Sequence, residues 1–150
     1  MQLTRSAHLA QDLSARQERL RIQKEELDKF KLAVDSSFNH TVITDPDGKV
    51  LYANEAAERL TGFSFEEMRG KTPALWGKQM SHEFYEAFWY AIKHEKRPFL
   101  GEVTNCRKNG EKYLATVNVS PILNEQKKVK FFVGIERDIT EERKHQKEIE

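Results

Sequence analysis

The sequence contains one cysteine and carries almost no net charge. The lone Cys106 excludes an intrachain disulfide and a cysteine-rich zinc site. The 25 basic and 24 acidic side chains nearly cancel, so the basic excess of a nucleic-acid-binding domain is missing. No apolar run approaches the roughly 18 residues of a transmembrane helix, and the N-terminus lacks a secretory apolar stretch. We therefore expect a cytoplasmic segment that binds no nucleic acid and does not insert into a membrane.

Recognisable catalytic motifs are also missing. The sequence contains no glycine-rich phosphate loop, no nucleophile paired with a base and no metal-ligand cluster at helical spacing. The acidic pairs Glu66-Glu67 and Asp45/Asp47 lie in predicted turns, where capping of backbone N–H groups explains them. We therefore predict that this segment is not an enzyme.

The first third of the chain lacks both helix breakers, since the first proline is Pro46 and the first glycine is Gly48. This stretch of about forty residues predicts one long helix. It is polar apart from one thin apolar stripe, so it needs a partner helix to be stable. We predict a coiled-coil-like signalling helix over 1–36 that pairs with a second copy, the alternative being packing on its own domain. The stripe consists of Leu13, Leu20, Leu27, Phe30 and Val34.

The pattern changes after residue 36 and predicts a compact domain over 37–138. Short β-rich runs alternate with turns and with helical stretches, the longest of which spans 81–96. This order predicts an α+β fold with one antiparallel sheet and helices gathered on one face. The strands are expected at 41–44, 49–53, 99–107, 112–122 and 129–137.

Capping signals mark where the helices begin. Asn54 is predicted to cap a short helix, and Ser64 with Glu67 matches a capping box. Asp138 with Glu141 matches the same motif, so residues 139–150 are predicted to start a C-terminal output helix.

Four short motifs occur in order and together resemble the PAS domain family over about 38–140. They are Thr44–Gly48 followed by Tyr52–Asn54, then Thr61–Ser64, then Gly101–Gly110, and finally Asp138–Glu141.

The resemblance implies a five-stranded antiparallel sheet, sensing of a ligand or partner, and homodimerisation through flanking helices. It also implies that Asp138, Ile139 and Thr140 pass a signal to the output helix. The effector would be a protein such as a histidine kinase or a cyclic-dinucleotide enzyme, encoded outside this segment.

Two kinds of sensor chemistry in this family fit the sequence poorly. Light-sensing LOV members bond flavin through a cysteine in the helical region, where residues 70–76 contain none and Cys106 is predicted on a strand. Haem-binding members use a histidine near the pocket. His82 and His94 are the candidates here, but each is also explained as an exposed residue near a helix end.

A third similarity is to the flavin-binding NifL-like subgroup, over 85–89 and 101–115. It implies that Trp89 lines a flavin ring and that Asn105 hydrogen-bonds it, although Phe99 stands where that subgroup has tryptophan. The cofactor is thus unknown, with FAD the leading candidate and haem the weaker one. The predicted pocket residues are Trp89, Asn105, Phe99, Asn118 and Trp76.

Trp89 and Asn105 have an alternative explanation as a core side chain and a partner for a local backbone bond. Two functions therefore stay open. The domain either senses a small ligand or redox cofactor, or serves as a ligand-free dimerisation and relay module.

Overall fold

The computed structural model describes residues 2–35 and 39–149, and the chain divides into two compact units, 1–36 and 37–150. The first unit is one 34-residue helix, α1 (Gln2–Asp35), as predicted. All side chains described from 4 to 29 are exposed. Leu13, Leu20 and Leu27 are 52%, 60% and 52% exposed, whereas the side chains of Phe30 and Val34 lie outside the described residues. The pairing of this helix with a second copy stays a prediction.

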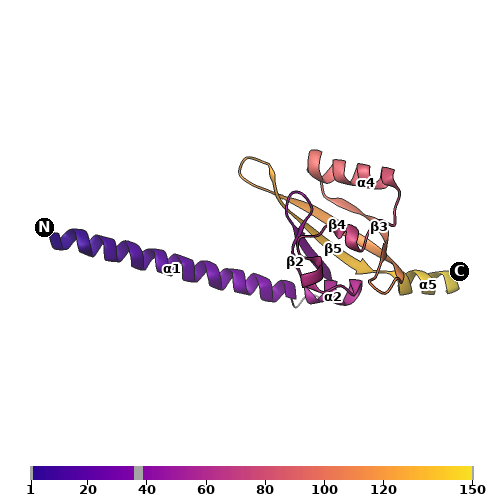
Figure 1. The fold of residues 1–150 in the computed structure, drawn as a ribbon, viewed down its shortest axis with the longest axis horizontal. Helices are drawn as coiled ribbons and strands as arrows, with labels where there is room; N and C mark the ends of the chain where they lie inside the picture. The colour runs from indigo at the N-terminus through magenta and orange to yellow at the C-terminus, as the bar shows by residue number, and fades with distance from the viewer. Residues whose placement is uncertain (1, 36–38, 150) are drawn as a thin grey trace. The chain divides into compact units, whose positions relative to one another are not determined.

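The second unit contains one antiparallel five-stranded sheet with the strand order β2-β1-β5-β4-β3. Figure 1 shows this sheet as a ribbon, with β2, β3, β4 and β5 labelled. Each predicted strand is present, and each differs from the prediction by one residue at one end. The strands are β1 (His40–Thr44), β2 (Val50–Ala53), β3 (Phe99–Cys106), β4 (Lys112–Leu123) and β5 (Val129–Asp138).

Helical segments connect β2 to β3. Asn54 caps the first of them by accepting a hydrogen bond from the N–H of Ala57, and Ser64 and Glu67 form the predicted capping box. The single helix expected over 81–96 is instead an α-helix followed by a wider π-helical turn. The segments are α2 (Glu55–Thr61), α3 (Phe65–Met68), η1 (Pro73–Leu75), α4 (His82–Trp89) and the π-turn η2 (Tyr90–His94).

The hydrophobic core has two clusters on the inner face of the sheet. The first joins β1 and β2 to the helical region through Val42, Ala57, Met68 and Trp76, among others. The second lies on the same face toward the other edge of the sheet, on β3 and β4, and consists of Val103, Tyr113, Ala115 and Val117. Because both clusters involve helical residues that cover the same face, the helices gather on one face as predicted.

The chain leaves the sheet through a tightly bonded junction into α5 (Thr140–Ile149). The predicted N-cap at Asp138 is wrong by one residue, because Asp138 still pairs with β4 and Ile139 accepts the first helical bond, from the N–H of Arg143. Asp138 instead accepts a hydrogen bond from the N–H of Thr140 at 2.9 Å and pairs with Arg107 at 2.7 Å. The junction is therefore fixed to β4 and to Arg107, the residue that follows β3.

Candidate functional site

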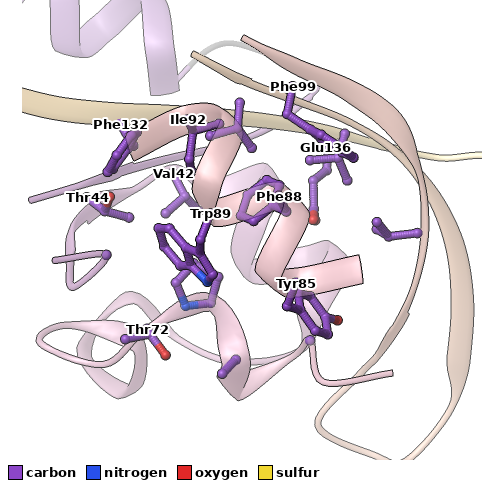
Figure 2. Close-up of a pocket in the computed structure, with 18 of the residues that line it drawn as sticks. Val42, Thr44, Thr72, Tyr85, Phe88, Trp89, Ile92, Phe99, Phe132 and Glu136 are labelled. Carbon is purple, nitrogen blue, oxygen red and sulfur yellow. The ribbon is translucent and has the colours of Figure 1, made fainter. Parts of the chain in front are cut away.

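A cavity of about 450 Å³ lies between the inner face of the sheet and the segment formed by α4 and η2. Figure 2 shows Phe88 and Trp89 directed into it from the helical side, and Val42, Phe132 and Glu136 from the sheet. This size is sufficient for a small organic ligand.

Several aromatic rings line the cavity. Phe88 and Phe99 lie edge to face with centroids 5.0 Å apart, and Trp89 lies edge to face with Phe132 at 6.0 Å. Trp89 also lies against the β1–β2 turn. A Cβ atom at Gly48, whose φ is +87°, would lie only 2.9 Å from the indole ring. The turn therefore needs glycine for both its conformation and this contact, and the wall offers flat apolar surface.

Another part of the cavity wall is polar, and its side chains are buried. His40, Asn105 and Glu136 are 3%, 4% and 8% exposed. Asn105 donates a hydrogen bond to Oε1 of Glu136 at 3.0 Å. The Nδ1 atom of His40 lies 3.2 Å from Oε2 of Glu136, yet the contact is not aligned as a hydrogen bond, and neither atom forms a well-aligned hydrogen bond with another described residue. Two buried polar atoms thus lie close together without a well-aligned hydrogen bond.

Burial shifts the acid–base chemistry of this polar end toward uncharged groups. It raises the pKa of Glu136 to about 7, although hydrogen bonds with Asn105 and Trp76 act in the lowering direction. It lowers the pKa of His40 to about 3. The nearby phenol of Tyr113 has its pKa raised by burial and by Glu136. A charge at this end of the cavity is therefore costly unless an occupant stabilises it.

The structure brings four of the five predicted pocket residues together, since Trp76, Trp89, Phe99 and Asn105 all line the cavity. The prediction for Asn118 is wrong. Asn118 is exposed and does not line the cavity, because side chains alternate along β4 and its neighbours Val117 and Val119 take the inner positions.

The two histidines considered as haem ligands do not line this cavity. His82 is exposed and its Nε2 atom pairs with Glu86 at 2.8 Å, and His94 is also exposed. Within the described residues there is no cluster of His, Cys, Asp and Glu side chains that could hold a metal ion. Cys106 is on β3, as predicted, and it does not line the cavity.

Sequence reasoning missed His40 and Glu136. A signal for Glu136 was available, because it continues the inward alternation of Phe132 and Gly134 along β5 and is the charged member of that row. His40 gave no comparable signal, since it lies at the first position of β1, before the predicted strand.

Comparisons with known proteins agree on one class of domain. The PAS domain family model matches residues 39–141. A nitrogen fixation regulatory protein of Klebsiella oxytoca is 30% identical over 99 residues, which are 65% of this chain and 20% of that protein. A blue-light photoreceptor of Listeria innocua is 31% identical over 122 residues, 79% of this chain and 47% of that protein.

A solved PAS domain from Colwellia psychrerythraea superposes with a TM-score of 0.69 at 26% identity, covering 77% of this chain and 98% of that domain. The chain belongs to the PAS domain family, and it is a sensory domain of the kind found in signalling proteins. It spans a fifth of the Klebsiella oxytoca relative and less than half of the Listeria innocua relative. No helix in the described part of the chain is long and apolar enough to cross a membrane.

Proposed function

We propose that this PAS domain senses a small ligand or redox cofactor in its cavity and passes the change through dimeric flanking helices to an effector. The observation that carries the proposal is the cavity itself, which is lined both by aromatic rings and by buried polar atoms without a well-aligned hydrogen bond to a described residue. Such an arrangement suits a planar molecule with a polar edge. The effector, such as a histidine kinase or a cyclic-dinucleotide enzyme, would be cytoplasmic like this domain.

FAD is the leading candidate for the occupant. Its isoalloxazine ring needs apolar surface of the kind that Trp89 and Phe132 offer, and its polar edge needs donors and acceptors such as the amide of Asn105. The similarity to a blue-light photoreceptor and to a nitrogen fixation regulator supports this choice. Haem is the weaker candidate, because His82 and His94 lie away from the cavity wall.

The proposed signal path runs along β5 into the output helix. Glu136 faces the cavity, and the junction residues Asp138, Ile139 and Thr140 follow it within four positions of the chain. Ile139 donates its N–H to the carbonyl of Leu114, and the hydroxyl of Thr140 accepts the N–H of Leu114, both at 2.9 Å. A ligand that prefers one position of β5 against β4 would therefore reorient α5.

A ligand-free dimerisation and relay module is the second candidate. Its support is the mutual packing of the aromatic rings, since Phe84, Phe88 and Phe99 contact one another edge to face or stacked. These rings could fill the site with side chains alone.

Absorption spectroscopy and FAD titration separate the two functions. We expect the purified protein to carry or bind flavin, with bands that are released intact on denaturation. Trp89→Ala should weaken FAD binding at least about fivefold, because base–aromatic and ring contacts of this kind are worth about 1–3 kcal/mol. The control is Tyr90→Ala, the neighbouring aromatic residue, which is 58% exposed and outside the cavity wall. Amide exchange at Leu114, with and without FAD, reports on the proposed signal path.

Several outcomes would count against flavin sensing. A spectrum with only Trp and Tyr absorption, together with no FAD binding, would leave the ligand-free module or a colourless ligand. A Soret band would favour haem. Equal affinities for Trp89→Ala and the unmodified protein would place the flavin outside the cavity.

The proposed dimer is tested on the exposed leucine stripe of α1. Replacing Leu20 and Leu27 together with lysine should convert a dimer into a monomer in sedimentation velocity, because two charges would enter the apolar seam. Gln11→Lys with Ser14→Lys is the matched control, since it adds the same number of positive charges away from the stripe. A dimer that survives the leucine replacements would show that the seam lies elsewhere.

A further inference from the structure

His40 and Glu136 are opposed across the β1–β5 ladder at the polar end of the cavity. The two residues are register partners on these neighbouring strands. Their side chains are 2% and 9% exposed, and Nδ1 of His40 lies 3.2 Å from Oε2 of Glu136. An acid and a base held this close in a buried site influence each other, so the proton affinity of each depends on the protonation state of the other.

The surroundings of the pair supply hydrogen bonds but little charge. Asn105 donates to Glu136, and the ring of Trp76 meets His40 edge to face with centroids 5.6 Å apart. From β4, the buried hydroxyl of Tyr113 lacks a hydrogen-bond partner and its phenol interacts electrostatically with Glu136.

Other titratable groups lie further around the cavity wall, on each remaining element that borders it. Asp47 in the β1–β2 turn and Lys78 before α4 are exposed to solvent, which screens them. Tyr85 on α4 is half-buried, and the ammonium of Lys93 on η2 lies 4.5 Å from the centroid of the Trp89 ring. The pKa of Glu136 is shifted by burial, Asn105 and Trp76, and not by any of these four groups.

We propose that the His40–Glu136 pair is a proton-binding site, which holds one exchangeable proton at neutral and lower pH and releases it to solvent water as the pH rises. On release, the carboxyl O–H bond breaks, its electron pair stays on Glu136, and the wall of the cavity becomes anionic. Because the pair joins β1 to β5, the loss of its proton alters the strand that leads into α5. The proposal stands on this geometry and does not depend on the ligand proposed above.

The direction of the pH effect follows from the two shifts. The raised pKa of Glu136 makes a stabilising contribution that is complete below its ordinary value of 4.5 and is lost as the pH rises through about 7. The lowered pKa of His40 makes a contribution that is present above its ordinary value of 6.5 and is lost as the pH falls through about 3. Together they favour the folded state most between these two ordinary values, where the pair is neutral overall.

Infrared difference spectroscopy of the full chain, without added ligand, tests the proposal directly. Between about pH 5 and about pH 9 we expect a buried protonated carboxyl band to disappear with a midpoint near or above neutrality. The fluorescence of Trp76 should change with the same midpoint, because its ring contacts His40. Glu136→Gln, which keeps the shape and removes the proton, should abolish both changes. Glu125→Gln, in the exposed β4–β5 turn, is the control that should retain them.

A third variant tests whether the two residues act as a unit. His40→Asn keeps a polar side chain but removes the base, and it should move the carboxyl midpoint by about one pH unit or more. An unchanged midpoint would overturn the paired site. So would a carboxyl band that is absent at the lowest pH, or one that titrates identically in Glu136→Gln.

Two further safeguards keep the test decisive. If Glu136→Gln does not fold, the nitrogen chemical shifts of the His40 imidazole, measured by NMR in the unmodified chain, decide the question. Between about pH 5 and about pH 9 they must change with the same midpoint as the carboxyl band, and His40 shifts that stay constant across this range refute the pair. If FAD does not bind, the flavin proposal fails, but the infrared titration of Glu136 still tests the proton site because it is measured without added ligand.

Discussion

Replacing Trp76 with alanine is expected to lower the free energy of unfolding by about 3–5 kcal/mol. The side chain is 2% exposed and belongs to the core cluster that includes Val42 and Met68. It also borders the cavity and contacts the ring of His40. Its removal therefore costs packing at the point where the core meets the candidate site.

Chemical denaturation of the purified protein measures this loss. Tyr90→Ala is the control, because Tyr90 is an aromatic residue that is 58% exposed, and surface replacements of this kind stay within about 0.5 kcal/mol. A Trp76→Ala variant that unfolds at the same denaturant concentration as the control would mean that Trp76 contributes little to the core. Trp76 would then not be tightly packed between the core and the cavity.

The parts of the fold that could be predicted are those set by local chemistry. Asn54 and Ser64 bond to backbone N–H groups three residues ahead, so their roles are visible in a short window of sequence. Turn residues such as Gly48 and Gly110 have positive φ in the structure, and they separate the predicted strands correctly. The helix start at Asp138 was misplaced by one residue because strand pairing with β4 extends through Asp138, and this pairing is not local.

Cavity residues could be predicted from the sequence only where a distinctive residue type stands in a recognisable motif. Trp89 and Phe99 are large aromatic side chains within recognisable motifs, and both line the cavity. Asn118 does not line the cavity, because the inward positions of Val117 and Val119 on either side place it on the opposite face of the sheet. The contact between His40 and Glu136 depends on the pairing of the first strand with the last one, so residue spacing alone could not reveal it.

The π-turn η2 illustrates a further limit of the sequence pattern. Apolar residues at helical spacing predicted a continuous α-helix through 96, but the hydrogen bond from Glu95 reaches back five residues to Tyr90. The wider turn buries Ile92, which is 1% exposed and lines the cavity next to Lys93. The apolar spacing thus predicts the helix correctly, but it does not reveal the π-turn that places Ile92 in the cavity wall.

Asn54→Ala should also destabilise the domain strongly, by about 2–4 kcal/mol, because one buried side chain satisfies three backbone groups. Its Oδ1 atom accepts the N–H groups of Thr41 at 2.9 Å and Ala57 at 3.0 Å, and its Nδ2 atom donates to the carbonyl of Asn39 at 2.9 Å. Asn54 is 1% exposed, so water cannot easily replace these bonds.

The chain offers a matched control for this replacement. Asn124 also accepts two backbone N–H groups, from Gln126 at 2.9 Å and Lys128 at 3.0 Å, but it is exposed in the turn between β4 and β5. Asn124→Ala should therefore cost less than about 1 kcal/mol, because water takes over the freed bonds. Denaturant unfolding of both variants measures the difference between the same chemistry in a buried and in an exposed place.

The comparison also bears on the site, because Thr41 follows His40 on β1. Loss of the Asn54 bond should loosen the start of this strand and increase amide exchange at Thr41 and Ile135, which are register partners on β1 and β5. If Asn54→Ala costs no more than Asn124→Ala, water reaches this end of the sheet. The same access would weaken the case for a dry environment around the His40–Glu136 pair.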